Sequence, residues 1–451
     1  MISWSGMGRD RSTSSNRTPQ QPPFELDIER LVWGGKGLGR QEGKVIFVPK
    51  AVPGDRALVE VVRERTNFAE ARLLSVTRPG PGRVDPGCPW FEACGGCQWL
   101  AASYPIQVAQ KEAMLQGALR HHHVGLRLEP LFPASPALGY RHRGDFHVRH
   151  DGERTRLGFF EEGTHRLVEI SGCLLFGTEF HDVLEKLRSA LSGRAAPKFL
   201  ERLTIAHSED RPDRFVAHGR MGPAAEGEFA TSLVNELMAC GLEGVVLTER
   251  GRVLAASGSP HIWFGVPSAG GDLRLRADVR SFTQAHFAMN RELVRTALEW
   301  MDLHGSERVL DLFSGVGNFS LPLARSCREV VAVEGSSTAC ADARFNAESN
   351  QVSNLRHREG PVGRVVADLS ETGERFDAVL LDPPRTGARE CLEGLVRLEP
   401  SRILYVSCNL PSVERDIGVL RSLGYRPIRV RGFDCFPQTY GLETLCLLSR
   451  E

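Results

Sequence analysis

Val309-Leu310-Asp311-Leu312-Phe313-Ser314-Gly315-Val316-Gly317 is the stretch that decides the fold, because an apolar run of strand length passes directly into a glycine-rich turn. A helical pattern over residues 319–324 follows, so the stretch predicts a strand, a turn and a helix. Glycines at such a turn let the backbone approach a ligand, and the helix presents free N–H groups at its positive dipole end. We therefore expect a ligand at this turn.

The next apolar run, residues 329–333, ends in Glu334, which lies about 20 residues after the turn, the spacing at which a carboxylate reaches a ribose diol. Gly315 and Gly317 lack the third glycine that packs the helix of a dinucleotide site, which favours S-adenosylmethionine over a dinucleotide. A similar sheet without any cofactor remains an alternative. Further strands are expected at residues 378–381, 402–406, 428–431 and 444–448, the last two as an antiparallel hairpin. The pattern predicts a doubly wound, Rossmann-like α/β domain.

Cys408 follows one of these strands, in Ser407-Cys408-Asn409, and lies downstream of Asp382-Pro383-Pro384-Arg385. A thiolate can add to an electron-poor ring carbon and leave again, so it can activate a pyrimidine that would otherwise not react. Cys408 is therefore a candidate nucleophile for covalent chemistry on a base. The alternative is a small core residue at a strand end, the usual role of a free cysteine.

From about Phe24 to Ser449 the chain resembles the RNA uracil-5 methyltransferase family, in the subgroup with an N-terminal TRAM domain and an iron–sulfur cluster that is best known from 23S ribosomal RNA enzymes. The segments that carry the resemblance are 311–319, 381–387, 407–409 with Asp416, and 436–439 leading to Glu443-Thr444.

The resemblance implies that Cys408 is the nucleophile and Glu443 the proton acceptor. The residues that it matches to S-adenosylmethionine contacts are Gln284, Phe313, Asn318, Glu334 and Asp382. Without it, Glu443 would be interpreted as a solvated charge and Gln284 as a polar cap of a helix near Asn290. His286 and Gly441 depart from the family pattern, which usually has asparagine and histidine there.

Uracil C5 is too weakly nucleophilic to attack a sulfonium methyl group, but addition of the Cys408 thiolate to C6 makes C5 enolate-like. Release then needs a base to remove the C5 proton, a step suited to Glu443. We expect the substrate to be structured RNA, most consistently 23S ribosomal RNA. Three alternatives stay open: a tRNA uracil-5 methyltransferase, a cytosine-5 enzyme, which would have a second cysteine where Pro384 stands, and a non-catalytic RNA-binding or assembly factor.

Four cysteines form a second constellation, with three in the segment 88–97 and one far downstream: Cys88, Cys94, Cys97 and Cys173. The glycines between them let the chain wrap closely around a bulky centre. Thiolates with one distant partner suit an iron–sulfur cluster, and the same spacing allows a structural zinc site. The family resemblance favours a [4Fe-4S] cluster. The other cysteines show no pairing pattern, so we expect a reducing, cytoplasmic location.

Length and composition allow several domains: 451 residues, of which 41% are hydrophobic. We expect a disordered tail at 1–22, a TRAM-like, oligonucleotide-binding-type β-barrel at 23–80, a central α/β domain with the cluster at 81–290 and the methyltransferase domain at 291–451. No apolar run reaches membrane-spanning length, no DNA partner is expected, and the oligomeric state is open.

The formal net charge is zero, so RNA must be held by a local patch. Arginines gather in the central segment: Arg120, Arg127, Arg141, Arg143, Arg149, Arg154, Arg156 and Arg166. We expect Lys36, Arg141 and Arg143 to be the first RNA contacts to test.

Overall fold

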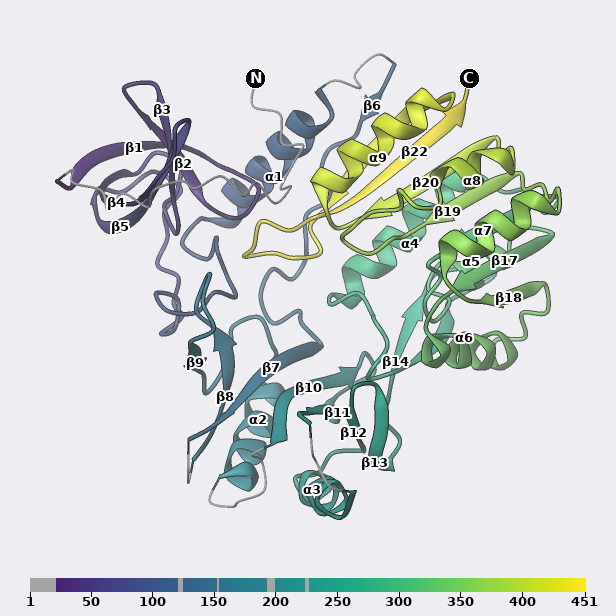
Figure 1. Ribbon diagram of the computed structural model, residues 1–451, viewed down its shortest axis with the longest axis horizontal. Coiled ribbons are helices and arrows are strands. Elements are labelled where there is room, and N and C mark those ends of the chain that lie inside the picture. Colours follow the sequence, from purple (N-terminus) through teal and green to yellow (C-terminus); the bar gives the residue numbers. More distant parts are fainter. Residues whose placement is uncertain (1–21, 121–124, 152–153, 193–198, 224–226) are drawn as a thin grey trace. The chain divides into compact units, whose positions relative to one another are not determined.

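The computed structural model of the protein describes residues 22–120, 125–151, 154–192, 199–223 and 227–451 (Figure 1). The tail expected over residues 1–22 lies outside these residues, apart from Pro22, and stays a prediction. The chain divides into two compact units. The smaller unit takes the described residues of the ranges 1–87, 97–121 and 436–442, and the larger unit takes those of 88–96, 122–435 and 443–451.

The smaller unit is built on a closed five-stranded barrel in the order β1-β2-β3-β5-β4, which confirms the predicted small β-barrel. Its strands are β1 (Phe24–Leu31), β2 (Gly37–Gln41), β3 (Lys44–Val48), β4 (Arg56–Glu64) and β5 (Phe68–Arg78). Alternate side chains such as Leu26, Ile28 and Val59 fill the interior. Closure pairs the edge strands, which protects them from association with other chains.

The same unit contains α1 (Tyr104–Ala118) and the segment 436–442, which immediately precedes Glu443 in the sequence. Gln107 of α1 is fully buried, and its amide exchanges two hydrogen bonds with Gln438, of 2.7 and 2.8 Å. Lys111 donates to the carbonyl oxygen of Phe436 at 3.0 Å. These contacts hold the segment 436–442 on α1.

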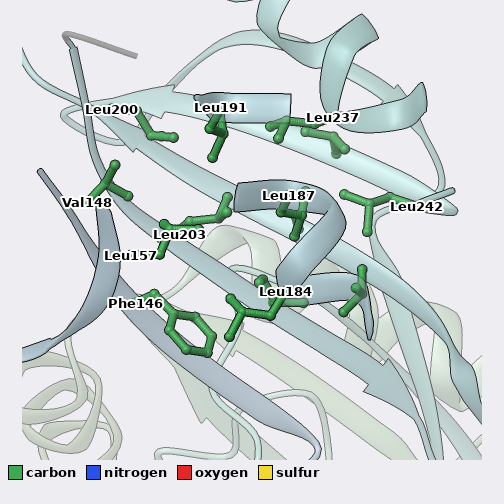
Figure 2. Packing of buried hydrophobic residues seen from close by; sticks show 14 of the residues in the cluster. Phe146, Val148, Leu157, Leu184, Leu187, Leu191, Leu200, Leu203, Leu237 and Leu242 are labelled. Carbon is green, nitrogen blue, oxygen red and sulfur yellow. The ribbon is translucent and has the colours of Figure 1, made fainter. Parts of the chain in front are cut away.

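The larger unit contains a seven-stranded sheet in the order β13-β12-β11-β10-β7-β8-β9. Its strands are β7 (Arg143–His150), β8 (Thr155–Phe160), β9 (Leu167–Glu169), β10 (Leu200–Ser208), β11 (Arg211–Met221), β12 (Gly244–Glu249) and β13 (Arg252–Gly258). The helices α2 (Thr178–Leu191) and α3 (Gly227–Ala239) pack on one face. The buried side chains of α2 recur at helical spacing, and Figure 2 shows Leu184 and Leu187 among side chains of the sheet such as Phe146.

The larger unit also contains an eight-stranded sheet in the order β18-β17-β16-β19-β20-β22-β21-β6. Its strands are β6 (Arg127–Leu128), β16 (Arg308–Leu312), β17 (Glu329–Glu334), β18 (Leu355–Glu359), β19 (Ala378–Leu381), β20 (Arg402–Ser407), β21 (Tyr425–Phe433) and β22 (Glu443–Arg450). The first five strands in that order are parallel, and β22 is antiparallel to both β20 and β21, which confirms the doubly wound sheet and the predicted hairpin.

Helices accompany this sheet (Figure 1): α4 (Phe287–Met301), α5 (Ser320–Ala324), α6 (Ser337–Ser349), α7 (Val362–Glu371), α8 (Leu392–Arg397) and α9 (Leu410–Ser422). A separate hairpin of β14 (His261–Val266) and β15 (Leu273–Asp278) precedes α4. Strand order runs outward from β16 through β17 in one direction and through β19 in the other, so the switch point lies between β16 and β19. Ligands of such sheets bind outside the carboxyl ends of the strands at that point.

Candidate active site

The turn after β16 has the backbone conformation that a ligand cradle requires. Phe313, Gly315 and Gly317 all have positive φ angles, 63°, 56° and 95°. A non-glycine residue rarely adopts this region, so Phe313 stores strain at the turn. A Cβ atom built on Gly315 would meet no atom within 4 Å, so the backbone there faces open space. The turn is therefore shaped to let a ligand lie against its backbone.

Glu334, at the end of β17, fixes this turn through its carboxylate. One oxygen accepts the backbone N–H of Gly315 at 2.9 Å, and the other accepts that of Ser336 at 2.7 Å. The carboxylate thus lies beside the glycine turn, where the sequence placed a ribose-binding acid. Each oxygen of a carboxylate can accept more than one hydrogen bond, so both retain capacity for a diol.

Asp311 lies beneath the turn and is fully buried. Ser320 donates to its Oδ2 atom, while no hydrogen-bond partner for Oδ1 is found in the described part of the chain. Burial, with the nearby carboxyls of Asp382 and Glu334 acting in the same direction, raises the pKa of Asp311 to about 7. An orphaned buried acceptor next to the turn favours a polar ligand there.

Asn318, also matched to the cofactor, is bound to α4. Its side-chain amide exchanges two hydrogen bonds with that of Asn290, of 2.8 and 3.0 Å. The pair fixes the start of α4 beside the glycine turn. A direct contact of Asn318 with a cofactor stays a prediction.

The loop Asp382–Arg385 leaves the carboxyl end of β19, next to the switch point. Its shape is fixed from α9, whose buried Asp416 accepts the backbone N–H of Ala388 at 2.8 Å and the Tyr405 hydroxyl at 2.7 Å. Asn409 also donates to the carbonyl oxygen of Arg385 at 2.7 Å. The sequence drew attention to Asp416 only as part of a motif; the structure gives it the role of holding this loop.

Cys408 lies where β20 passes into α9, partly buried and just before Asn409, the N-cap residue of the helix. Burial raises the pKa of its thiol to about 11, and the carboxyls of Glu443 and Asp382 act in the same direction. Arg385 opposes them, because its side chain hydrogen-bonds the sulfur and its positive charge favours the thiolate. The helix N-terminus adds a favourable dipole. The resting thiol is protonated, with a cation in place to stabilise the anion once it forms.

Glu443 is the first residue of β22 and is 1% exposed. Because β22 runs antiparallel to β20, with Thr444 opposite Ser407, its start lies at the same edge as Cys408. Burial raises the pKa of Glu443 well above its usual value, the neighbouring Asp382 raises it further, and a hydrogen bond from Gln284 lowers it.

Two oxygen atoms at this point, Oε2 of Glu443 and Oε1 of Gln284, are buried without a hydrogen-bond partner among the described residues. A polar ligand with a donor group would satisfy both, as the N–H of a uracil could. The structure thus brings together Cys408, Glu443, Gln284, Asp382 and Arg385 at one sheet edge.

Comparison with known proteins shows the family to which the chain belongs. The family model described as tRNA (Uracil-5-)-methyltransferase matches residues 261–359 and 362–451, and the TRAM domain model matches residues 24–74. A curated relative from Pectobacterium atrosepticum, named 23S rRNA (uracil(1939)-C(5))-methyltransferase RlmD, is 34% identical over 92% of this chain and 90% of its own length. A relative of the same name from Pseudomonas putida is also 34% identical, over 97% of each chain. The chain belongs to the RNA uracil-5 methyltransferase family.

A solved structure supports the fold of this family member. The Pyrococcus abyssi tRNA (uracil-54, C5)-methyltransferase in complex with S-adenosyl-L-homocysteine matches with a TM-score of 0.72 and 23% identity, covering 94% of this chain and 99% of that one. The enzyme class predicted from the sequence, a methyltransferase with an N-terminal TRAM barrel, is confirmed.

His286, where this uracil-5 methyltransferase departs from the family pattern, has a structural role. Its Nδ1 atom accepts the backbone N–H of Met289 at 3.5 Å as the N-cap of α4, and its Nε2 atom lies 3.1 Å from the carbonyl oxygen of Pro136. The two contacts require a neutral ring with the proton on Nε2. Burial lowers the pKa of His286, which favours that form. A histidine here does the capping that an asparagine side chain would do.

The cationic side chains expected to bind RNA have different surroundings. Arg143 is partly buried, and its guanidinium donates to the carbonyl oxygen of Ser281 at 2.6 Å, so its contact with RNA stays a prediction. Lys36 is paired with Glu70 at 2.8 Å. Arg149 is exposed, with its guanidinium carbon 5.4 Å from the ring centre of Phe160.

The cysteines of the larger unit that were matched to the cluster lie close enough to interact. Burial raises the pKa of Cys173 to about 11, and the thiols of Cys94 and Cys88 contribute to the rise. Gly95 allows a close passage of the chain, because a Cβ atom there would lie 2.9 Å from the backbone of residues 160 and 162. No group of three or more His, Cys, Asp or Glu side chains that could hold a metal ion is found in the part of the chain that the structure describes.

The described helices include none that is long and apolar enough to cross a membrane.

Proposed function

We propose that this protein transfers a methyl group from S-adenosylmethionine to C5 of a uridine in 23S ribosomal RNA, at the position equivalent to the uracil 1939 named for its relatives. The observation that carries the proposal is that Cys408, which follows the end of β20, lies close to Glu443, which begins the antiparallel strand β22. The relatives that cover more than nine tenths of the chain share the 23S name. We also propose a cytoplasmic location, where ribosomal RNA is modified.

The cofactor residues fit S-adenosylmethionine. The open backbone at Gly315 would face its amino acid part, and Glu334 would accept the ribose hydroxyls, since its carboxylate is already oriented by two backbone N–H groups. Phe313, Gln284, Asp382 and Asn318 complete the proposed set. When bound, S-adenosylmethionine supplies an electrophilic methyl group on a positively charged sulfonium.

In the proposed mechanism, Cys408 loses its proton to solvent water and its sulfur forms a bond with uracil C6, while the C5–C6 π bond breaks and its electron pair moves to C5. Arg385 stabilises the thiolate before attack and again when it departs. C5 then bonds to the methyl carbon as the S⁺–CH₃ bond breaks. Glu443 removes the C5 proton, the C5–C6 double bond re-forms and the C6–S bond breaks. The raised pKa of Glu443 makes its ionised form a stronger base.

The proposed division of labour follows the domains expected from the sequence. Residues 23–80 and 81–290 would bind folded RNA, and residues 291–451 would transfer the methyl group. A uracil inside a helix is stacked, so the target must come from a loop or be extruded.

The four cysteines are proposed to hold a [4Fe-4S] cluster. The thiols of Cys88, Cys94 and Cys173 interact in the larger unit, and Cys97 is three residues after Cys94. An all-thiolate donor set suits iron–sulfur clusters. Protein purified without oxygen should be brown and contain about four iron and four sulfide per chain. Cys173→Ser should lower both. Colourless protein with one zinc would instead support the structural zinc site.

The decisive experiment compares RNA substrates for the purified protein. Radiolabelled methyl groups from S-adenosylmethionine should enter a 23S ribosomal RNA fragment that contains the uracil at 1939, and nuclease digestion should yield 5-methyluridine. Transfer to tRNA alone would assign the protein to the tRNA branch of the family, a candidate favoured by the description of the matching family model and by the structural relative. RNA binding without transfer to any RNA would contradict the enzymatic proposal.

A further inference from the structure

The seven-stranded sheet of the larger unit carries a hollow of about 850 Å³, and none of its lining residues belongs to the site of Cys408. Four of the charged lining residues are arginines, and one is a glutamate, Glu201. The arginines are Arg149, Arg202, Arg220 and Arg250. In a protein of zero net formal charge, this is a local concentration of positive charge.

Strand register places Arg202 and Arg220 side by side, and these two arginines form a positive row. Arg220 of β11 lies directly opposite Arg202 of β10, and Arg202 lies directly opposite His147 of β7. Adjacent strands are about 4.8 Å apart, and like charges directly opposite one another destabilise a sheet. Asp145 offsets part of this repulsion, with an oxygen 2.7 Å from Arg202 and 3.7 Å from Arg220. One carboxylate shared by two guanidinium groups leaves a net positive charge that an anion would compensate.

Flat groups lie next to the row. The ring of His147 is stacked on that of Phe160, with centroids 3.6 Å apart and planes inclined by 20°, and the guanidinium of Arg149 approaches the same ring. His147 accepts a hydrogen bond from Arg202 at 3.1 Å through Nε2, which orients both groups. Nucleic-acid bases stack on surfaces of this kind.

We propose that this hollow is a second RNA-binding subsite, in which Arg202 and Arg220 bind consecutive phosphates of a single-stranded segment and Phe160 with His147 receives a base. The inference rests on the proposed function, because RNA is the polyanion that the enzyme must hold. Guanidinium forks bind phosphate oxygens in pairs, and an adjacent aromatic surface matches the alternation of phosphate and base along a strand.

The test uses the full-length protein and a transcribed 23S ribosomal RNA fragment that contains the uracil at 1939. Arg202→Ala/Arg220→Ala is compared with Arg211→Ala/Arg252→Ala, which also removes two exposed cations from the same sheet but outside the hollow. The dissociation constant is measured across salt concentrations, together with KM and kcat for methyl transfer. Thermal unfolding of each variant shows whether it is folded.

Removing the row should raise the dissociation constant and KM roughly tenfold at about 0.15 M salt, and flatten the salt dependence by about 1.4, the slope for two phosphates of a single strand. The value of kcat at saturating RNA should be unchanged, and the control should stay within about twofold of the wild type. Arg202→Lys/Arg220→Lys should restore most of the slope, since lysine keeps the charge. Phe160→Leu should weaken binding about fivefold or more without changing the slope.

Wild-type affinity and slope in both Arg202→Ala/Arg220→Ala and Phe160→Leu would overturn the subsite. ATP binding is measured as well: if the wild-type protein binds ATP and the row variant loses that binding while its RNA binding stays intact, the hollow is a nucleotide site and the RNA subsite is overturned. Failure of the proposed function looks different: the wild-type protein itself would then transfer no methyl group to any RNA.

Discussion

Replacement of Glu443 by glutamine separates the two halves of the proposed reaction. Glutamine has almost the same shape, and its carbonyl oxygen can accept the hydrogen bond that Gln284 donates to the native carboxylate. It cannot accept the C5 proton. Because Glu443 is buried with a raised pKa, a neutral side chain also removes the cost of ionising it, so the variant should be at least as stable as the wild type at neutral pH.

The expected slowing of RNA release follows from the proposed role of Glu443 as a general base. A positioned general base contributes about 10²- to 10⁴-fold, so release of the methylated RNA should slow by that factor while addition and methyl transfer continue. If formation and release of the adduct are equally fast in the wild type, half of the enzyme is attached to RNA at steady state. A hundredfold slower release alone would raise the attached fraction to about 99%.

The adduct is measured on a denaturing gel with a radiolabelled methyl group, which marks RNA that is both methylated and bound to protein. Glu359→Gln is the matched control, because Glu359 is an exposed carboxylate at the carboxyl end of β18, at the same sheet edge. The control should turn over normally. Normal turnover of Glu443→Gln without a trapped complex would refute the assignment of Glu443 as the base.

Three further results are expected. Cys408→Ala should form no covalent complex with RNA that contains 5-fluorouridine at the target and should not methylate RNA; undiminished methylation would exclude the thiol as nucleophile. Because the pKa of Cys408 is about 11, the rate of adduct formation with that RNA should rise up to tenfold per pH unit between about pH 7 and 9 and should fall in Arg385→Met, whereas a rate independent of pH would show that the thiolate is already formed. Because the pKa of Asp311 is raised to about 7, ionisation of this carboxyl destabilises the folded protein fully above about pH 7 and not at all below about pH 4. Asp311→Asn should therefore be more stable than the wild type by up to about 4 kcal/mol at pH 8, but not at pH 4, as measured by urea unfolding. Equal stabilities of the two proteins at pH 8 would contradict this.

Local patterns were enough to predict the elements that carry chemistry at the sheet edge. The strand and glycine turn at 309–317 are encoded within nine residues, and Cys408 follows an apolar run of strand length, so both could be recognised directly. Glu443 could not. It lies 35 positions after Cys408 in the sequence, and only the antiparallel pairing of β22 with β20 brings the two to one edge. The family resemblance supplied what the local pattern lacked.

The positive row in the hollow also could not be predicted from local sequence patterns. The density of arginines in the sequence drew attention to Arg143, which is partly buried and hydrogen-bonded to Ser281. It did not single out Arg202 and Arg220, which lie 18 residues apart in the sequence and become neighbours through strand register. A weak signal was present: on β11 the polar His218 and Arg220 alternate with small or apolar residues, the period of a strand with one solvated face. Alternation reveals a polar face but not which residues of another strand will stand opposite.

The position of β22 also bears on the order in which the protein can assemble during synthesis. It is the last of the sheet strands to be made, yet it lies between β20 and β21, both of which the ribosome has already delivered. Until it arrives, β20 has an unpaired edge and β21 with β6 has no place in the sheet, the kind of exposed surface that promotes aggregation. Completion of the sheet and delivery of Glu443, the proposed catalytic carboxylate, are therefore one event. A polypeptide cut short after Phe433 would lack both, so a translation error here should yield a molecule for degradation and not a folded, inactive competitor of the complete protein.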